Sequence, residues 1–482
     1  MTMPKSLLFT AATFFAFVAV SQSRPLQDQQ PSAVPGATAQ SALAAQDADQ
    51  DQQGPNASAS AATPVEDTRP LAGAEVGVQI PGARRGYLLP SFSFAEVGDT
   101  NNQIVPGGST FATASIPVAR MELDHVGRRT DFAADYLGGA LLYNSVSQSD
   151  TTFQQFGFSE KYTGRQWNLL LSDRFSYLPE AEFGFGGISE LGSFGIGSQL
   201  GLGGGLGQLN PAFGPGQSIL TGQAGRYTNV AVGQAQYRVT ARTSFTGIAA
   251  VANVQFQQNS FISGNDLTLT GAVDHSLSAR DSLSVAYTFS ALRFNGLGEA
   301  INSYVIQAGY GRRITGRLSF RLLGGPEITQ IASGGVTFPA RLYASGQGEL
   351  SYHLERSDFS LAYRQFIEPG SGVLAGALTS AVTASWNRRL TQSWSGYLYA
   401  GYGRNAGLQQ SIVNSNGLFN YENGGLRLSR NWGRSFTLFA LYTVQYQSSN
   451  IAFPIFSGNP GRVVVVHTFG VGLDVHSRPF GI

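Results

Sequence analysis

The chain has 482 residues and a formal net charge of +1, and only 13% of its residues are charged. This balance gives no reason to expect nucleic acid or another polyanion as a partner. The sequence contains no Cys, which excludes disulfides, thiolate metal sites and lipid attachment to an N-terminal Cys.

The first 23 residues have the features of a secretory signal peptide. Lys5 is followed by an apolar stretch from about Leu7 to Val20 and then by small residues at Ser21 and Ser23. This stretch is shorter than the roughly 20 residues that a spanning helix needs, so a membrane anchor is the less favoured interpretation. No later stretch has that length, and a membrane protein with this sequence would therefore cross the bilayer as strands.

Residues 24–85 are rich in Gln, Ala, Pro, Asp and Gly and contain no Phe, Tyr or Trp. Such a segment cannot bury enough apolar surface to offset the conformational entropy lost on folding. We therefore predict that residues 24–85 form a disordered periplasmic linker.

From Gly86 onward, apolar and polar residues alternate in long runs. Between Asp281 and Phe294, for example, Leu283, Val285 and Tyr287 alternate with small residues. A period of two is typical of a β-strand with two different faces. The polar face carries Ser, Thr, Gly and Gln rather than Lys and Glu, which favours a wet interior over an exposed surface. Residues 86–482 are therefore predicted to form an all-β domain with its apolar face outside.

The connections between these runs are alternately short and long. Short turns are predicted near Gly127, Gly164, Ala241, Arg280, Gly316, Arg356, Thr391 and Gly433. Eight hairpins with one further strand at each end give about eighteen strands. Strict alternation places all short turns on one rim and all long loops on the other. This arrangement predicts a transmembrane antiparallel up-and-down β-barrel with both ends in the periplasm.

The side chains divide between a lipid face and a lumen face according to the same alternation. In one clear strand, Leu361 and Tyr363 alternate with Ser360 and Arg364. The strands near Val230 to Phe256 alternate less cleanly, so their register is less well defined. In a later strand, Phe439 and Leu441 fall on the side predicted to face the lumen.

The positions of the four Trp residues also favour a membrane protein. Each lies within about five residues of a predicted short turn, where an aromatic girdle meets the periplasmic headgroups. They are Trp167, Trp386, Trp394 and Trp432.

The end of the chain carries a pattern associated with barrel assembly. In TFGVGLDV, the residues Thr468, Gly470, Leu473 and Val475 fit the spacing by which outer-membrane barrels present their last strand to the assembly machinery. The final residues HSRPFGI depart from the usual terminal aromatic residue, because Phe480 lies near the end but not at it.

The export signal, the meander and the opening strand GYLLPSFSFAEVGDTNNQ together resemble the outer-membrane β-barrel, porin-like proteins of diderm bacteria. The resemblance covers about Gly86 to His476. It implies an outer-membrane location, with membrane lipid and the barrel-assembly machinery as partners. Porin-like barrels often form trimers, so the resemblance leaves a homo-oligomer open.

A search for catalytic motifs points away from an enzyme. The sequence has no Gly-x-Ser-x-Gly elbow and no His-Glu-x-x-His motif, and the glycine cluster around Gly195 to Gly207 lacks the lysine of a phosphate loop. The set nearest to a catalytic triad is Glu349, Ser351 and His353. Same-face neighbours on one strand lie roughly 7 Å apart, so we expect polar lumen residues without direct hydrogen bonds. The five His residues are scattered, and no metal or cofactor site is predicted.

Charged residues opposite the apolar stripe are the candidate lining of a pore. They are Arg120, Glu122, Asp131, Asp135, Arg174, Asp274, Arg321, Glu349, Asp358, Arg364 and Arg389. Mixed signs around a lumen can create a transverse field that orients polar solutes. The other interpretation is that these residues form ion pairs along the wall of a wet lumen.

The connection 178–229 is far longer than the others and too rich in Phe, Leu and Ile for a solvated loop. We expect it to fold into the lumen as a constriction, or else to form an external cap.

The leading prediction for function is passive diffusion of small hydrophilic solutes across the outer membrane. The alternative is an occluded structural or export-associated barrel, for example one that serves polysaccharide or surface-layer assembly.

Overall fold

The computed structural model describes residues 86–100, 111–144, 150–178, 225–296, 298–370, 372–408, 417–433, 435–450, 463–478 and 480–481. The predicted signal peptide 1–23, the predicted linker 24–85 and residues 179–224 of the long connection lie outside these ranges. Within them, no helix is long and apolar enough to cross a bilayer.

The described residues form eighteen long strands and two strands of two residues each. The long strands are β1 (Tyr87–Asp99), β2 (Ala112–Val126), β3 (Thr130–Tyr143), β4 (Thr151–Thr163), β5 (Trp167–Leu178), β6 (Arg226–Arg238), β7 (Thr243–Phe256), β8 (Gly264–Ser276), β9 (Asp281–Phe294), β10 (Glu299–Arg313), β11 (Leu318–Ser333), β13 (Arg341–Leu354), β14 (Ser357–Glu368), β15 (Ala377–Arg389), β16 (Trp394–Gly407), β17 (Leu418–Trp432), β18 (Phe436–Ser449) and β19 (Val463–His476). The short strands are β12 (Val336–Thr337) and β20 (Phe480–Gly481).

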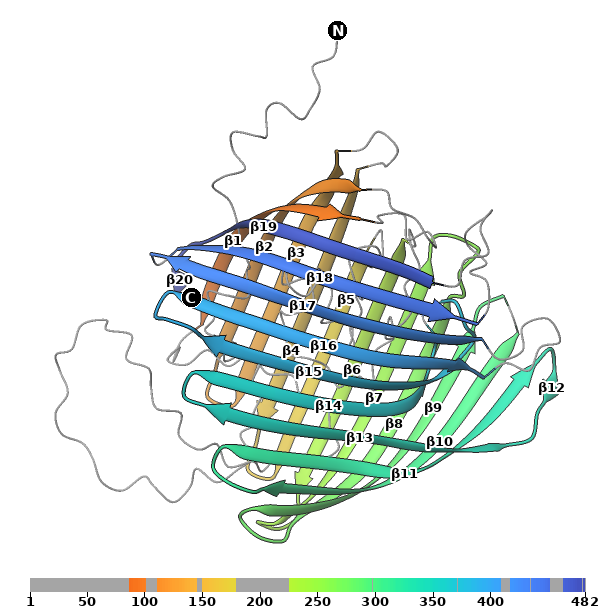
Figure 1. The fold of residues 1–482 in the computed structure, drawn as a ribbon. Coiled ribbons are helices and arrows are strands. Elements are labelled where there is room, and N and C mark those ends of the chain that lie inside the picture. Colours follow the sequence, from red (N-terminus) through yellow and green to blue (C-terminus); the bar gives the residue numbers. More distant parts are fainter. Residues whose placement is uncertain are drawn as a thin grey trace, which may run out of the picture.

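These strands close into a barrel. Each long strand pairs antiparallel with its neighbours in sequence, and β1 pairs with β19 to complete the ring. In Figure 1, strands β13–β19 (teal to blue) cross in front of β2–β9 (orange to green). The prediction of an all-β, up-and-down barrel of about eighteen strands is confirmed, and each predicted short turn joins two of its strands.

The outer face of the barrel is apolar and exposed. In β9, Leu283, Val285 and Tyr287 are 43%, 58% and 48% exposed, whereas Ser284 is 2% exposed. All four Trp residues also lie on the outer face, close to the short turns. A soluble monomer rarely leaves so large a continuous apolar surface in water. An apolar band with an aromatic girdle is the exterior of a transmembrane barrel.

The inner face is less uniform than the alternation predicts. Many of its residues are polar or charged, but one buried cluster inside β1–β4 and β18 includes Ile116, Leu137, Phe153, Phe439 and Leu441. The two residues that seemed misplaced in β18 therefore do face inward, where they pack against the wall on the other side of the β1–β19 closure. The guanidinium of Arg427 lies 3.8 Å from the centroid of the Phe439 ring.

A second apolar patch on the inner face explains the weak alternation of β6 and β7. Val230, Val232 and Ile248 point inward and are buried with small residues of β7. Since residues such as Val251 on the outer face are apolar as well, both faces of these strands are apolar. The alternation of apolar and polar residues is therefore weak in β6 and β7 because their inward residues pack on one another instead of facing water.

Candidate functional site

The end of β14 separates from β13 at the long-loop rim, while β14 and β15 remain in the sheet through β16. Pairing between β13 and β14 extends no further toward this rim than Gly346 opposite Gln365, whereas pairing between β14 and β15 continues to Glu368 opposite Ala377. At the point of separation, the side-chain amide of Gln365 donates to the Ala344 carbonyl across 2.8 Å. The last three residues of β14 therefore have no strand partner on β13 and are paired only with β15.

The loop that follows, Pro369–Gly376, crosses the mouth of the barrel, and we call it the crossing loop. On one side, the Ile262 N–H donates to the Gly372 carbonyl across 2.8 Å. Ile262 lies in the β7–β8 connection, and β9, β10, β11 and β13 separate β8 from β14 along the wall. On the other side, Leu374 packs with Phe419 of β17 and Val464 of β19. These contacts join distant parts of the wall, so the loop lies across the lumen rather than along the rim.

Three glycines give the crossing loop its shape. Gly370, Gly372 and Gly376 have φ values of 77°, 77° and 82°, in the region that side chains disfavour. A Cβ on Gly372 would also clash with the Phe256 ring, and one on Gly376 would clash with the Ile301 side chain. Both the backbone conformation and the close approach to the wall therefore require glycine here.

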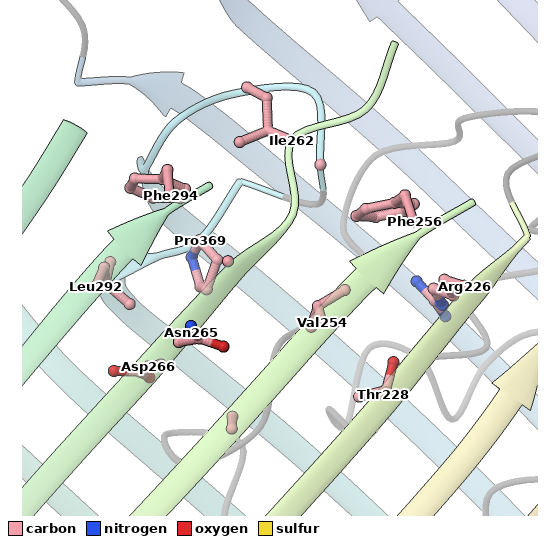
Figure 2. Close-up of a pocket in the computed structure, with 13 residues that line it drawn as sticks. Arg226, Thr228, Val254, Phe256, Ile262, Asn265, Asp266, Leu292, Phe294 and Pro369 are labelled. Carbon is pink, nitrogen blue, oxygen red and sulfur yellow. The ribbon is translucent and has the colours of Figure 1, made fainter. Parts of the chain in front are cut away.

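A small cavity lies between the crossing loop and the wall formed by β6–β9. Figure 2 shows Pro369 of the loop between Phe294 on one side and Phe256 on the other. The cavity that these residues line has a volume of about 30 Å³, which is room for roughly one water molecule. Its polar lining includes Arg226 and Asp266, and the Asp266 carboxylate accepts a hydrogen bond of 2.9 Å from Ser290.

Charged side chains lie directly beside the crossing loop. Arg364 and Glu368, on the inner face of β14, form an ion pair of 3.1 Å with 7% and 10% of their side chains exposed. Glu327 of β11 accepts a hydrogen bond of 2.5 Å from Ser303 and another from the backbone N–H of Ile367. The part of the lumen beside the crossing loop therefore carries charges of both signs.

Burial alternates along each strand, and every predicted pore-lining residue lies at a position whose side chain points into the barrel. Arg120, Glu122, Asp135, Arg174, Asp274 and Arg364 are buried, Asp131, Arg321, Glu349 and Asp358 are half-buried, and Arg389 is exposed at the short-turn rim. Their contribution to a conducting pore remains a prediction.

The structure brings some of these predicted residues together. Arg120 and Glu122 are 3.4 Å apart, and Arg321 lies directly across the β11–β13 pair from Glu349. Asp135 acts electrostatically on Arg174.

Several charged residues near the crossing loop were missed by the sequence reasoning. They are Arg226, Asp266, Glu327 and Glu368. Two of them could have been predicted from the alternation. Glu327 lies an even number of residues from Arg321 on β11, and Glu368 lies an even number from Arg364 on β14, so each points to the same side as that arginine. Nothing in the sequence indicates that these residues meet at one loop.

The candidate catalytic set on β13 separates into two pairs. Ser351 donates to Glu349 across 3.2 Å, and His353 Nδ1 lies 3.0 Å from Asp358 Oδ1 on β14. The expectation that no direct hydrogen bond joins same-strand neighbours was wrong for Ser351, because the longer Glu349 side chain bends along the strand to reach it. His353 pairs with Asp358 rather than with Glu349. Among the residues that the structure describes, no group of three His, Cys, Asp or Glu is placed to hold a metal ion.

Solved structures with a similar chain course include three from two organisms. Pseudomonas aeruginosa OpdQ has 8% identity and a TM-score of 0.40, with 82% of this chain and 98% of that chain covered. Acinetobacter baumannii OccAB2 has 9% identity and a TM-score of 0.41, with 82% and 98% covered. Pseudomonas aeruginosa OccK2 (OpdF) has 10% identity and a TM-score of 0.42, with 81% and 98% covered. No family model matches the chain, and no curated protein matches it.

Proposed function

We propose that this chain is a bacterial outer-membrane channel through which small hydrophilic solutes diffuse passively, with the crossing loop as its narrowest point. The apolar, Trp-bearing exterior supports placement in a bilayer. β1 starts and β19 ends at the short-turn rim, as in outer-membrane barrels whose two ends lie in the periplasm. The pattern at Thr468 to Val475 lies on the strand that closes the ring, which supports recognition by the assembly machinery.

The proposed mechanism requires no catalytic group. A barrel of eighteen strands is wide enough to enclose an aqueous passage unless something fills it. Selectivity then depends on pore width and on the charges along the wall. The observation that carries the proposal is the crossing loop, which is bonded to the β7–β8 side and packed against β17 and β19. It narrows the mouth next to the Arg364–Glu368 pair.

The predicted pore-lining residues fit this mechanism because they carry charges of both signs. Arg120, Glu122, Asp135 and Arg174 form one group on the inner face of β2, β3 and β5. Charges of opposite sign at fixed positions orient a polar solute without binding it tightly, which suits diffusion.

The test is the conductance of the barrel with and without its crossing loop. The full chain is refolded into planar bilayers, and Gly370–Ala375 is replaced by two glycines. We expect a larger single-channel conductance and faster swelling of liposomes in sugar solutions. A matched control shortens residues 334–337 in the exposed β11–β13 connection on the same rim, which should leave the conductance unchanged. Equal conductance of the intact and replaced forms would refute the constriction, and no conductance from either would refute the channel.

One observation favours the alternative of an occluded structural or export-associated barrel. Ile116, Val118 and Leu137 point inward but are at most 1% exposed, because inward-facing side chains pack on one another there. Part of the lumen is therefore filled by the wall itself. An occluded barrel would give no liposome swelling in either form, whereas a channel swells in both and faster without the crossing loop.

A further inference from the structure

A groove lies on the outer face of the barrel beside the short-turn rim, and we call it the rim groove. Its lining is Tyr352 and Leu354 of β13, Ser357 and Phe359 of β14, and Trp386 of β15, and its volume is about 400 Å³. All five residues have the outward parity. The rim groove therefore opens toward whatever surrounds the barrel and has no connection with the lumen.

Hydrogen bonding and strand register fix the walls of the rim groove. Phe359 lies directly between Tyr352 and Trp386 across the two strand pairs. The Trp386 indole N–H donates to Ser357 Oγ across 2.6 Å, which holds the ring in one orientation. Toward the middle of the barrel, the outward residue Leu361 has only Ala384 opposite it on β15, so the apolar surface continues along the strand direction.

The rim end of the groove is positively charged. Arg388 lies opposite Ser357, one outward position closer to the rim than Trp386, and its guanidinium is 5.8 Å from the Trp386 ring centroid. Arg356 is exposed in the β13–β14 turn. Glu355 in the same turn contributes one carboxylate, but Asp358 faces inward, where it pairs with His353.

The same polarity extends around the rim. Other exposed arginines at or beside the short turns include Arg128, Arg165, Arg242, Arg280 and Arg317. A ring of cations at the level of an aromatic girdle complements a leaflet that contains anionic headgroups. At the rim groove, a shaped apolar trough lies beside these cations.

We propose that the rim groove binds an anionic phospholipid of the periplasmic leaflet. Its acyl chain lies along Tyr352, Phe359 and Trp386, and its phosphate is contacted by Arg356 and Arg388. Guanidinium groups suit this contact because they donate two parallel hydrogen bonds to phosphate oxygens. The inference rests on the proposed placement in the outer membrane with the short turns toward the periplasm.

The test measures how lipids quench the fluorescence of Trp386. Trp167, Trp394 and Trp432 are replaced by Phe in the full chain, which is reconstituted in phosphatidylcholine vesicles. Bromine on the acyl chains of phosphatidylglycerol or of phosphatidylcholine serves as the quencher. We expect brominated phosphatidylglycerol to bind at Trp386 on the order of tenfold more tightly than brominated phosphatidylcholine, because two arginines attract its net charge.

Matched variants identify the cations responsible. The pair R356Q and R388Q should remove the preference for phosphatidylglycerol, whereas R242Q and R280Q, also exposed at short turns, should preserve it. A gel-mobility difference between heated and unheated samples checks that each variant is folded. If the first pair does not fold, native mass spectrometry of the unaltered chain with the two lipids still tests the preference.

The outcomes separate this inference from the proposed function. Equal quenching of the intact groove by both lipids would overturn the headgroup selectivity while leaving the membrane placement standing. No quenching by either lipid, with a crosslink between copies through β13–β15, would make the groove a protein interface and overturn lipid binding. No quenching without such a crosslink would refute the membrane placement itself. Absence of conductance with selective quenching would refute the channel alone.

Discussion

Replacement of Leu361 by Arg tests the assignment of the two faces most directly. Leu361 is 37% exposed on the outer face of β14, and its cross-strand neighbours are Leu350 and Ala384. It is four residues from the start of β14 at Ser357. At about 3.4 Å per residue and a tilt of about 40°, this places Leu361 roughly 10 Å above the short-turn rim. An apolar band about 25 Å tall then puts it close to the middle of the bilayer.

The expected cost follows from that depth. An Arg on the lipid face at the bilayer midplane destabilises a transmembrane barrel by about 2–4 kcal/mol. Ser360→Arg is the matched control, because the neighbouring side chain points into the lumen. That change loses the hydrogen bond of 2.6 Å between the hydroxyls of Ser360 and Ser385, which contributes about 1 kcal/mol. Leu361→Arg should therefore be the more damaging by at least about 1 kcal/mol.

The measurement is unfolding by guanidinium in phosphatidylcholine vesicles, followed by Trp fluorescence. The free energy of unfolding is obtained from the midpoint and slope, and heated and unheated gel samples report the folded fraction. Equal loss of stability in the two variants would refute the assigned faces. Greater loss from Ser360→Arg would show that the apolar face is directed inward.

Three further predictions concern the crossing loop and the closure of the ring. Glu368→Gln removes a carboxylate beside the loop, so the reversal potential in a KCl gradient should shift toward that of chloride, whereas Glu355→Gln in an exposed turn should cause no shift. Gly372→Val meets the Phe256 ring and should displace the loop and raise the conductance. Gly335→Val, also at positive φ but with nothing within 4 Å, should not. Ser93→Ala removes a buried hydrogen bond of 3.1 Å to Asp474 across the β1–β19 closure and should lower the free energy of unfolding by about 1–3 kcal/mol. An unchanged unfolding midpoint would contradict that role.

The barrel was predictable from the sequence because its strands and short turns each have a local sequence pattern. Strands such as β9 alternate between lipid and lumen with period two, and each short turn interrupts that alternation with turn residues. The prediction weakened at Val230 and Ile248 because both faces of β6 and β7 are apolar. Alternation identifies the outer face only where the inner face is polar.

The crossing loop was not predictable from the same patterns. The sequence prediction of a constriction fell on residues 178–229, most of which lie outside the described residues, because that connection is the longest and most apolar. The described crossing loop is short, and its inward course depends on where β13 releases β14, at Gln365. Where the pairing of β13 with β14 ends depends on contacts between distant parts of the chain, and no local sequence pattern marks it. The parity of Arg321 and Glu349 was predictable, but their pairing depends on the register between strands.

The closure between β1 and β19 has a consequence for how the molecule is made. It joins residues 381 positions apart, as in the bond between Ser93 and Asp474, and its register contains nine residue pairs, whereas β1 and β2 share thirteen. So distant a contact carries a large entropic cost and forms late. A nascent chain halted before β19 would have two unpaired strand edges, each able to recruit another chain. The cell must therefore shield this protein from aggregation until its last strand has been delivered.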